Sequence, residues 1–163
     1  VNLARLSTQA LRIVIVNARR PIGRGTAYST RRNEHLLNVA ARNMSAFPDF
    51  PEHFLGWLRS RSEFAALPEE DLRQMFVPRY IYGDYLCSLL AACQQPVDPR
   101  SNVQVETVDD EAVDIVVADD GGASVLLKSG ESLDADQVLL ATGNQPASTA
   151  SNSPSKASNQ LAA

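Results

Sequence analysis

Hydrophobic residues near the start of the chain follow two different spacings. Residues 1–7 carry apolar side chains as in the last turns of a helix, and residues 11–16, LRIVIV, are almost continuously apolar. Such a run of β-branched residues predicts a strand buried on both faces of a parallel sheet. A helix end, a short polar link and a buried strand form the second half of a βαβ unit. We therefore expect the first strand of that unit, and the turn after it, to precede Val1.

The middle of the chain combines a long loop with two helices. Residues 18–47 show no sustained periodicity and predict a loop, but their apolar content argues against disorder. We expect this loop to fold against something, and a bound cofactor is a good candidate. A helix is predicted directly after Pro51. A longer helix is predicted from about Arg79 to Gln94, where apolar residues recur at helical spacing.

From Asn102 onward the apolar residues recur with a period of two. Residues 103–108, 112–119 and 124–129 predict three short strands that form a β-meander. The segment QVLLATG at 137–143 predicts a further, buried strand. The pattern as a whole indicates an α/β fold, namely an incomplete Rossmann-type domain with a helical insertion and a three-stranded meander.

Length and composition indicate one domain followed by a tail. The chain has 163 residues, and residues 145–163 are rich in Ser, Ala and Asn, which predicts disorder there and leaves residues 1–144 as the domain. The formal net charge is -4 without a dense basic stripe, so nucleic acid is not an expected partner. Arg5 and Arg12 interrupt the apolar N-terminus, which therefore does not resemble a signal peptide. No apolar run approaches the roughly 20 residues of a membrane span, and we expect a cytoplasmic protein.

The residues that usually carry metal or nucleophilic chemistry are not suitably spaced. Cys87 and Cys93 stand six residues apart, which is neither CxxC nor a zinc-knuckle pattern, and predicts reduced thiols on a helix. No ligand set surrounds His35 or His53, so no metal site is predicted. No serine stands in a GxSxG setting. The chemistry is therefore expected to come from a cofactor.

Two glycine-containing turns are candidates for contacting such a cofactor. In Gly23-Arg24-Gly25 the backbone amides and the guanidinium could contact a phosphate, or the segment could be an ordinary structural turn. Arg24 also clusters with Arg19 and Arg20, which form either a solvated loop or a set of phosphate contacts. The turn at Thr142-Gly143 would let the backbone pass close to a flat ligand.

Four blocks of sequence resemble a bacterial family of FAD/NAD(P)-binding proteins, most of them uncharacterised. The family typically reads GRGxAYxT, then HLLNVxAxxMSAFPDxPxHFLxWL, then PRxxYGxYL and VLATGN. The chain reads GRGTAYST at 23–30, HLLNVAARNMSAFPDFPEHFLGWL at 35–58, PRYIYGDYL at 78–86 and VLLATGN at 138–144. The blocks occur in order over almost all of residues 11–144, so the chain is identified as a member of this family.

The resemblance implies an FAD site of the glutathione-reductase-like kind. Asn17 stands where such flavoproteins usually have an acidic residue that holds the adenosine ribose, so a neutral hydrogen bond replaces a charge-assisted one. The other implied contacts are the turn along the FAD (Gly23, Arg24, Gly25, Ala27, Tyr28), the segment near the flavin (Leu37, Asn38, Val39, Met44), the adenine contacts (Ala112, Val113) and the turn by the pyrophosphate (Thr142, Gly143). From the residues alone, Tyr28, Val39 and Met44 fit a packed core equally well.

Two functional hypotheses follow. None of the eight glycines precedes Gly23, so the GxGxxG turn and the central strand before it are expected upstream of Val1, and an NAD(P)-binding region is expected downstream. The first hypothesis is the FAD-binding portion of an NAD(P)H-linked flavin oxidoreductase, hydroxylase- or monooxygenase-like, acting on an unidentified small molecule. The second is a truncated, non-catalytic remnant that binds FAD weakly or not at all. No catalytic residue, oligomeric state or choice between NADH and NADPH is predicted.

Overall fold

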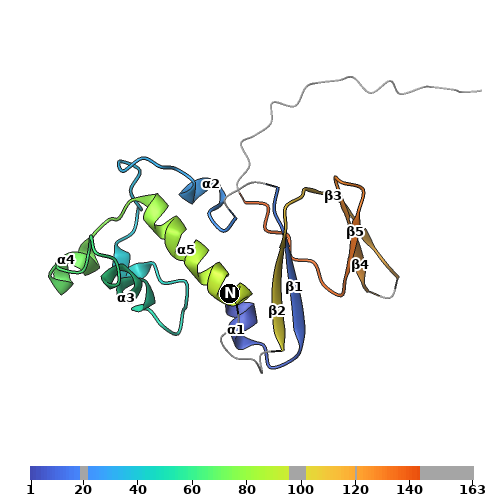
Figure 1. The fold of residues 1–163 in the computed structure, drawn as a ribbon, viewed down its shortest axis with the longest axis horizontal. Helices are drawn as coiled ribbons and strands as arrows, with labels where there is room; N and C mark the ends of the chain where they lie inside the picture. The colour runs from blue at the N-terminus through green and yellow to red at the C-terminus, as the bar shows by residue number, and fades with distance from the viewer. Residues whose placement is uncertain (19–21, 96–101, 120, 144–163) are drawn as a thin grey trace, which may run out of the picture.

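A computed structural model describes residues 1–18, 22–95, 102–119 and 121–143, and the predicted tail at 145–163 lies outside them. The mixed α/β class with a three-stranded meander is confirmed (Figure 1). The elements in chain order are α1 (Asn2–Leu6), β1 (Leu11–Val16), α2 (Gly25–Tyr28), η1 (Ala41–Asn43), α3 (His53–Arg59), α4 (Glu69–Gln74), α5 (Arg79–Gln94), β2 (Val103–Val108), β3 (Ala112–Val117), β4 (Ala123–Leu127) and β5 (Ser132–Ala135).

A two-stranded parallel sheet pairs a strand near the start of the chain with the strand that follows the helices. β1 pairs with β2 from Leu11 opposite Val103 to Val16 opposite Val108, and the connection between the two strands carries the helices α2 to α5. The prediction that residues 103–108 begin the meander is therefore wrong. An alternating pattern identifies a strand but not its partner, and a parallel partner requires a long crossover. The meander consists instead of β3, β4 and β5, with residues 132–135 as its third strand.

The parallel pair is less covered than its apolar sequence predicted. Residues of β1 are half-buried rather than buried on both faces, and Arg12 is exposed, where it forms an ion pair of 2.9 Å with Glu106 on β2. Among the described residues, β1 pairs with a strand only on its β2 side. Its open edge keeps an unpaired row of backbone groups.

The predicted buried strand at 137–143 is also wrong. These residues form no strand, and the side chains of Leu139 and Leu140 are 89% and 70% exposed. An apolar run is buried only where neighbouring strands and helices cover it, and no described strand pairs with this segment. In the view of Figure 1 this segment leaves the meander and runs toward the edge where β1 ends.

The hydrophobic core lies in the helical layer. Both predicted helices, α3 and α5, are confirmed, and α4 follows Pro68 with acidic residues in its first turn, where they complement the helix dipole. Tyr85 of α5 is fully buried at the centre of this layer, and its hydroxyl accepts a 3.3 Å hydrogen bond from the Ala46 amide. The buried cluster comprises Leu37, Ala41, Phe54, Leu55, Leu58, Phe64, Leu72, Val77, Ile81, Tyr82 and Tyr85.

The predicted loop at 18–47 is more structured than expected and folds against this helical core. It contains α2 and η1, and its residues 35–37 form a short antiparallel ribbon with residues 77–79, centred on the bridge between Leu36 and Pro78. Two backbone hydrogen bonds hold the ribbon, from Leu37 N to Val77 O at 2.9 Å and from Arg79 N to His35 O at 2.8 Å. The packing of the helical layer therefore accounts for much of the loop's apolar content.

Helix α1 is attached to the same layer through one arginine. The Arg5 guanidinium makes two hydrogen bonds of 2.7 and 2.8 Å to the Asp49 carboxylate and lies 5.2 Å from the centre of the Phe47 ring. A bidentate pair combined with a ring contact is stronger than a lone surface ion pair. Within the described part of the chain, no helix is long and apolar enough to cross a membrane.

Gly83 allows the turn after β1 to lie directly on α5. A Cβ atom at this position would lie 2.8 Å from the Tyr28 carbonyl oxygen and 2.7 Å from Nη1 of Arg24. The Tyr28 backbone atom cannot move aside without shifting α2. The space beside Gly83 is therefore filled by another part of the chain, which explains a glycine in the interior of a helix.

We expect Gly83→Ala to destabilise the fold by about 1–3 kcal/mol, because overpacking outweighs the roughly 1 kcal/mol that alanine gains in helix propensity. Urea unfolding followed by circular dichroism measures this change. Gly56→Ala on α3 is the matched control, since a Cβ there meets nothing within 4 Å and should stabilise the helix. A Gly83→Ala protein as stable as the unsubstituted chain would contradict the close contact.

Candidate functional site

Asn17 lies at the carboxyl edge of the parallel strand pair. It directly follows β1 and is half-buried. Its backbone N–H donates a 2.9 Å hydrogen bond to the carbonyl of Val108 at the end of β2. In open parallel sheets ligands bind outside the carboxyl ends of the strands. The structure therefore places this predicted ribose contact at the edge where a nucleotide would be held.

The turn from Gly23 to Tyr28 continues from this edge onto α5. Gly23 and Gly25 have positive φ angles of 89° and 57°, a conformation that side chains other than glycine rarely adopt. Gly25 begins α2, and Ala27 is exposed on it. The Tyr28 ring packs edge-on against Tyr82 of α5 with 4.9 Å between ring centres. The two glycines thus shape a turn whose backbone is open to solvent on the side away from α5.

Arg24 is used within the fold. Its guanidinium donates to the Tyr80 carbonyl at 3.0 Å and forms an ion pair with the Asp84 carboxylate, one helical turn further along α5. The side chain is only 18% exposed. Of the two interpretations of Gly23-Arg24-Gly25, the structural turn therefore describes what the arginine does here, while the glycine backbone remains available to a ligand.

The ribbon separates the predicted flavin-side residues into two groups. Leu37 is buried opposite Val77, and Val39 and Met44 are half-buried, with Met44 packed on the core cluster. Asn38 is exposed. Phe76, which precedes the residues paired with this segment, is also exposed, at 49%. Asn38 is accordingly the residue of this segment best placed to contact a ligand.

Phe76 is a candidate that the sequence reasoning did not select. The alternation of Met75 and Val77, which face the core, with Phe76 was the available signal, because a period of two places Phe76 on the other face. A half-exposed aromatic ring beside a polar amide offers a flat apolar surface with a hydrogen-bonding edge.

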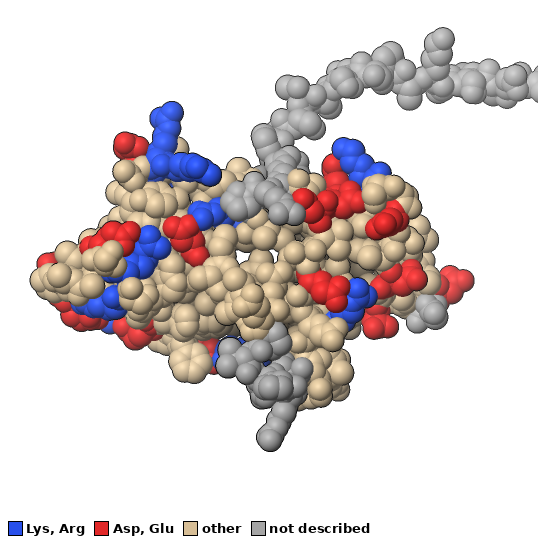
Figure 2. Space-filling view, viewed as in Figure 1, with Lys and Arg blue, Asp and Glu red and all other residues tan. Residues whose placement is uncertain are grey.

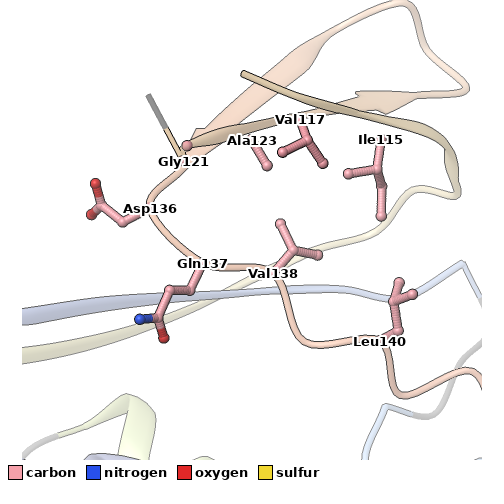
Figure 3. Close-up of a pocket in the computed structure, with 9 residues that line it drawn as sticks. Ile115, Val117, Gly121, Ala123, Asp136, Gln137, Val138 and Leu140 are labelled. Atoms are coloured by element: carbon pink, nitrogen blue, oxygen red, sulfur yellow. The ribbon is translucent and has the colours of Figure 1, made fainter. Parts of the chain in front are cut away.

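The remaining predicted contacts lie toward the meander. Ala112 and Val113 are exposed at the start of β3, and Thr142 and Gly143 are exposed in the segment after β5, with a φ of 67° at Gly143. An open apolar hollow of about 440 Å³ lies between this segment and the meander. Figure 3 shows Val138 directed toward Val117 across it.

A second, more polar hollow lies between α2 and α5. Its volume is about 490 Å³, and it is lined by Arg24, Ser29, Arg31, Tyr80 and Asp84. In the described part of the chain no group of three or more His, Cys, Asp or Glu residues could hold a metal ion. Cys87 and Cys93 are both free thiols on α5. The site is therefore composed of backbone, arginine, amide and aromatic groups.

A parallel strand pair joined by a helical crossover, together with an antiparallel meander, is consistent with a partial Rossmann-like α/β domain. The match of residues 1–145 to a family model described as FAD-NAD(P)-binding identifies it further. The chain belongs to this FAD/NAD(P)-binding family, as its four sequence blocks predicted. No curated protein matches the chain significantly.

Burial keeps the tyrosines of the core in their neutral form. Burial, together with the neighbouring Tyr28 and Tyr85 phenols, raises the pKa of Tyr82 from 10.0 to about 12. Burial also raises the pKa of Tyr85, whose hydroxyl lies 2.9 Å from Nδ1 of His53. Neither phenol is prepared for deprotonation near neutral pH, so they serve packing and hydrogen bonding.

We expect the Tyr82 phenol to make the protein sensitive to alkali. Its pKa is about 12 folded against 10.0 for the unperturbed group, so its stabilising contribution is complete below pH 10 and is lost as the pH rises toward 12. Urea unfolding at several alkaline pH values measures this, and Tyr82→Phe should flatten the decline in that window. An unchanged decline in Tyr82→Phe would show that other groups control it.

Proposed function

We propose that the chain forms the FAD-binding part of an NAD(P)H-linked flavin oxidoreductase of hydroxylase or monooxygenase type. The observation that carries this proposal is the placement of Asn17 and the glycine turn at the carboxyl edge of β1 and β2, in a chain of the FAD/NAD(P)-binding family. Ligands of such sheets occupy this edge. The electron transfer would be supplied by the flavin, with NAD(P)H as reductant and a small molecule as substrate.

Several described residues fit an FAD molecule at this edge. Asn17 would hydrogen-bond the adenosine ribose, and the positive-φ glycines at 23 and 25 keep the turn free of side chains on which the cofactor would press. Asn38 would present its amide to the flavin from its exposed position after the ribbon. The diphosphate has no glycine-rich helix start of its own among these residues. The fit therefore supports the ribose and ring ends of the cofactor.

A second candidate is a non-catalytic remnant with little affinity for FAD. The exposure of Leu139 and Leu140 and the open edge of β1 favour it, because both indicate a sheet whose inner positions are uncovered. The two candidates differ in one property. The oxidoreductase part should bind FAD once a strand and glycine turn complete the sheet, whereas the remnant should not.

We expect residues 1–163 alone to bind FAD with a Kd above about 10 μM. Fusion of a strand, a GxGxxG turn and the start of a helix before Val1 should yield protein that retains flavin through purification, because this supplies the diphosphate turn and pairs β1. Flavin fluorescence titration measures both proteins. Stoichiometric micromolar binding by residues 1–163 would contradict the first expectation, and a fused but flavin-free folded protein would favour the remnant.

In the flavin-retaining fusion, Asn17→Asp should tighten FAD binding about fivefold. A carboxylate accepts a ribose hydroxyl through a charge-assisted bond, which contributes about 1 kcal/mol more than a neutral bond. Asn33→Asp in the exposed segment after α2 is the control that adds the same charge away from this edge. Equal effects of the two substitutions would remove Asn17 from the ribose site.

A further inference from the structure

The polar hollow between α2 and α5 has a surplus of positive charge. Arg24 and Arg61 both direct guanidinium groups at Asp84, Arg24 in a close ion pair and Arg61 with Nη1 at 3.9 Å from the carboxylate. The exposed carboxylate of Glu63 forms an ion pair of 3.0 Å with Arg61 and neutralises part of its charge. The two carboxylates thus balance these two arginines. The lining itself holds the cations Arg24 and Arg31 and the one carboxylate of Asp84, so Arg31 is the charge left unbalanced.

The hydrogen-bond donors of this cluster are not fully used either. Within the described residues, Nε of Arg24 and Nε of Arg61 are buried without an acceptor. Buried donors without acceptors are rare and leave their positive potential uncompensated. Although these two atoms are too enclosed for direct contact, they raise the potential felt by an acceptor in the hollow.

Arg31 is the cation that remains accessible. It is exposed at the rim of the hollow, and in the described parts of the chain its guanidinium forms no ion pair. Tyr80, on the opposite wall, belongs to the first turn of α5, where the helix dipole adds further positive potential. The exposed guanidinium of Arg31 and the first turn of α5 therefore both favour an oxyanion at the opening.

The rest of the molecule directs anions to the same side. Lys128 is the one basic residue between positions 102 and 143, so the meander is strongly acidic. Figure 2 shows acidic side chains prevailing over the meander, while both signs are mixed over the helical layer. An anionic ligand is repelled from the meander and meets its accessible cation at Arg31.

We propose that this hollow binds an oxyanion group, with Arg31 as its principal cation. A guanidinium offers paired N–H donors that suit both phosphate and carboxylate groups. Arg24 holds the wall in place through Asp84 and does not itself carry the ligand. The hollow shares Arg24 with the turn that the resemblance places along the FAD, but it includes neither Asn17 nor Asn38, so the two proposals are tested separately.

Trp57, the single tryptophan, provides a fluorescence signal beside the arginines that face Asp84. The Arg61 guanidinium lies 5.1 Å from the centre of the Trp57 ring, and the same group faces Asp84. An anion that attracts the arginines of this cluster should change the Trp57 fluorescence. Titration of residues 1–163 with inorganic phosphate, and separately with acetate, at constant ionic strength tests the proposal and distinguishes the two sources of oxyanion.

We expect saturable binding of at least one of these anions, and Arg31→Gln should weaken it about tenfold through loss of a charged hydrogen bond. Arg32→Gln is the matched control, because it removes the same charge at the adjacent exposed residue. A rise in the thermal unfolding midpoint with added anion should follow the same order. Circular dichroism shows that each variant is folded.

Saturation by phosphate alone identifies a phosphate subsite, and saturation by acetate as well identifies a general oxyanion subsite. Absence of saturable binding to either anion, or equal weakening by Arg31→Gln and Arg32→Gln, overturns the proposal. The fusion protein with the added strand and GxGxxG turn separates the two hypotheses. A fusion that retains flavin but shows no saturable anion binding rejects only the hollow, and a folded fusion that binds the anion but retains no flavin rejects only the flavin site.

Discussion

The contact of the Arg24–Tyr28 turn with α5 at Gly83 is the constraint on which the rest of the arrangement depends. Only a residue without a side chain allows the Tyr28 carbonyl to approach the helix this closely. This approach brings Arg24 within reach of Tyr80 and Asp84, one helical turn apart on α5. The chain leaving β1 is thereby joined to the helical core. That join fixes the glycine turn between the end of β1 and α5, with the polar hollow between α2 and α5.

Stability is distributed unevenly between the two parts that this contact connects. Of the six largest fully buried side chains among the described residues, only Leu127 belongs to the meander; the other five belong to the helical layer or the segments packed on it, namely Tyr85, Phe54, Leu58, Leu72 and Val77. β1 is only half-buried, and the segment after β5 exposes leucines. Regions with few buried contacts open at lower free energy than the core. A ligand held at the carboxyl edge would therefore stabilise the part of the fold that its own packing stabilises least.

The sequence predicted the elements better than their partners. Apolar spacing identified β1, α3 and α5, because these patterns depend on residues close in the chain. The strand at 103–108 was assigned to the meander, since alternation cannot show that a strand more than 80 residues earlier is its neighbour. The run at 139–140 was predicted to be buried, but burial requires covering elements that no local pattern specifies.

The candidate site shows the same division. Positive-φ glycines and the asparagine after β1 were predictable, because glycine content and strand ends are local features. Two facts were not predictable. Asp84, 60 positions away, engages Arg24, and Leu37 is buried beside Val77 while the adjacent Asn38 stays exposed. Tertiary pairing decides which side chains of a motif remain free for a ligand.

The pairing of Arg24 with Asp84 changes the role expected of the arginine in the glycine turn. In isolation, an arginine between two glycines suggests a phosphate contact, yet its charge is committed to Asp84 and its side chain is largely buried. Loss of either partner of this half-buried ion pair would leave a poorly solvated charge, so releasing Arg24 to a ligand costs free energy. An anion near this turn must be held by a cation outside that pair. Arg31, which no sequence motif singled out, is the accessible group that meets this requirement.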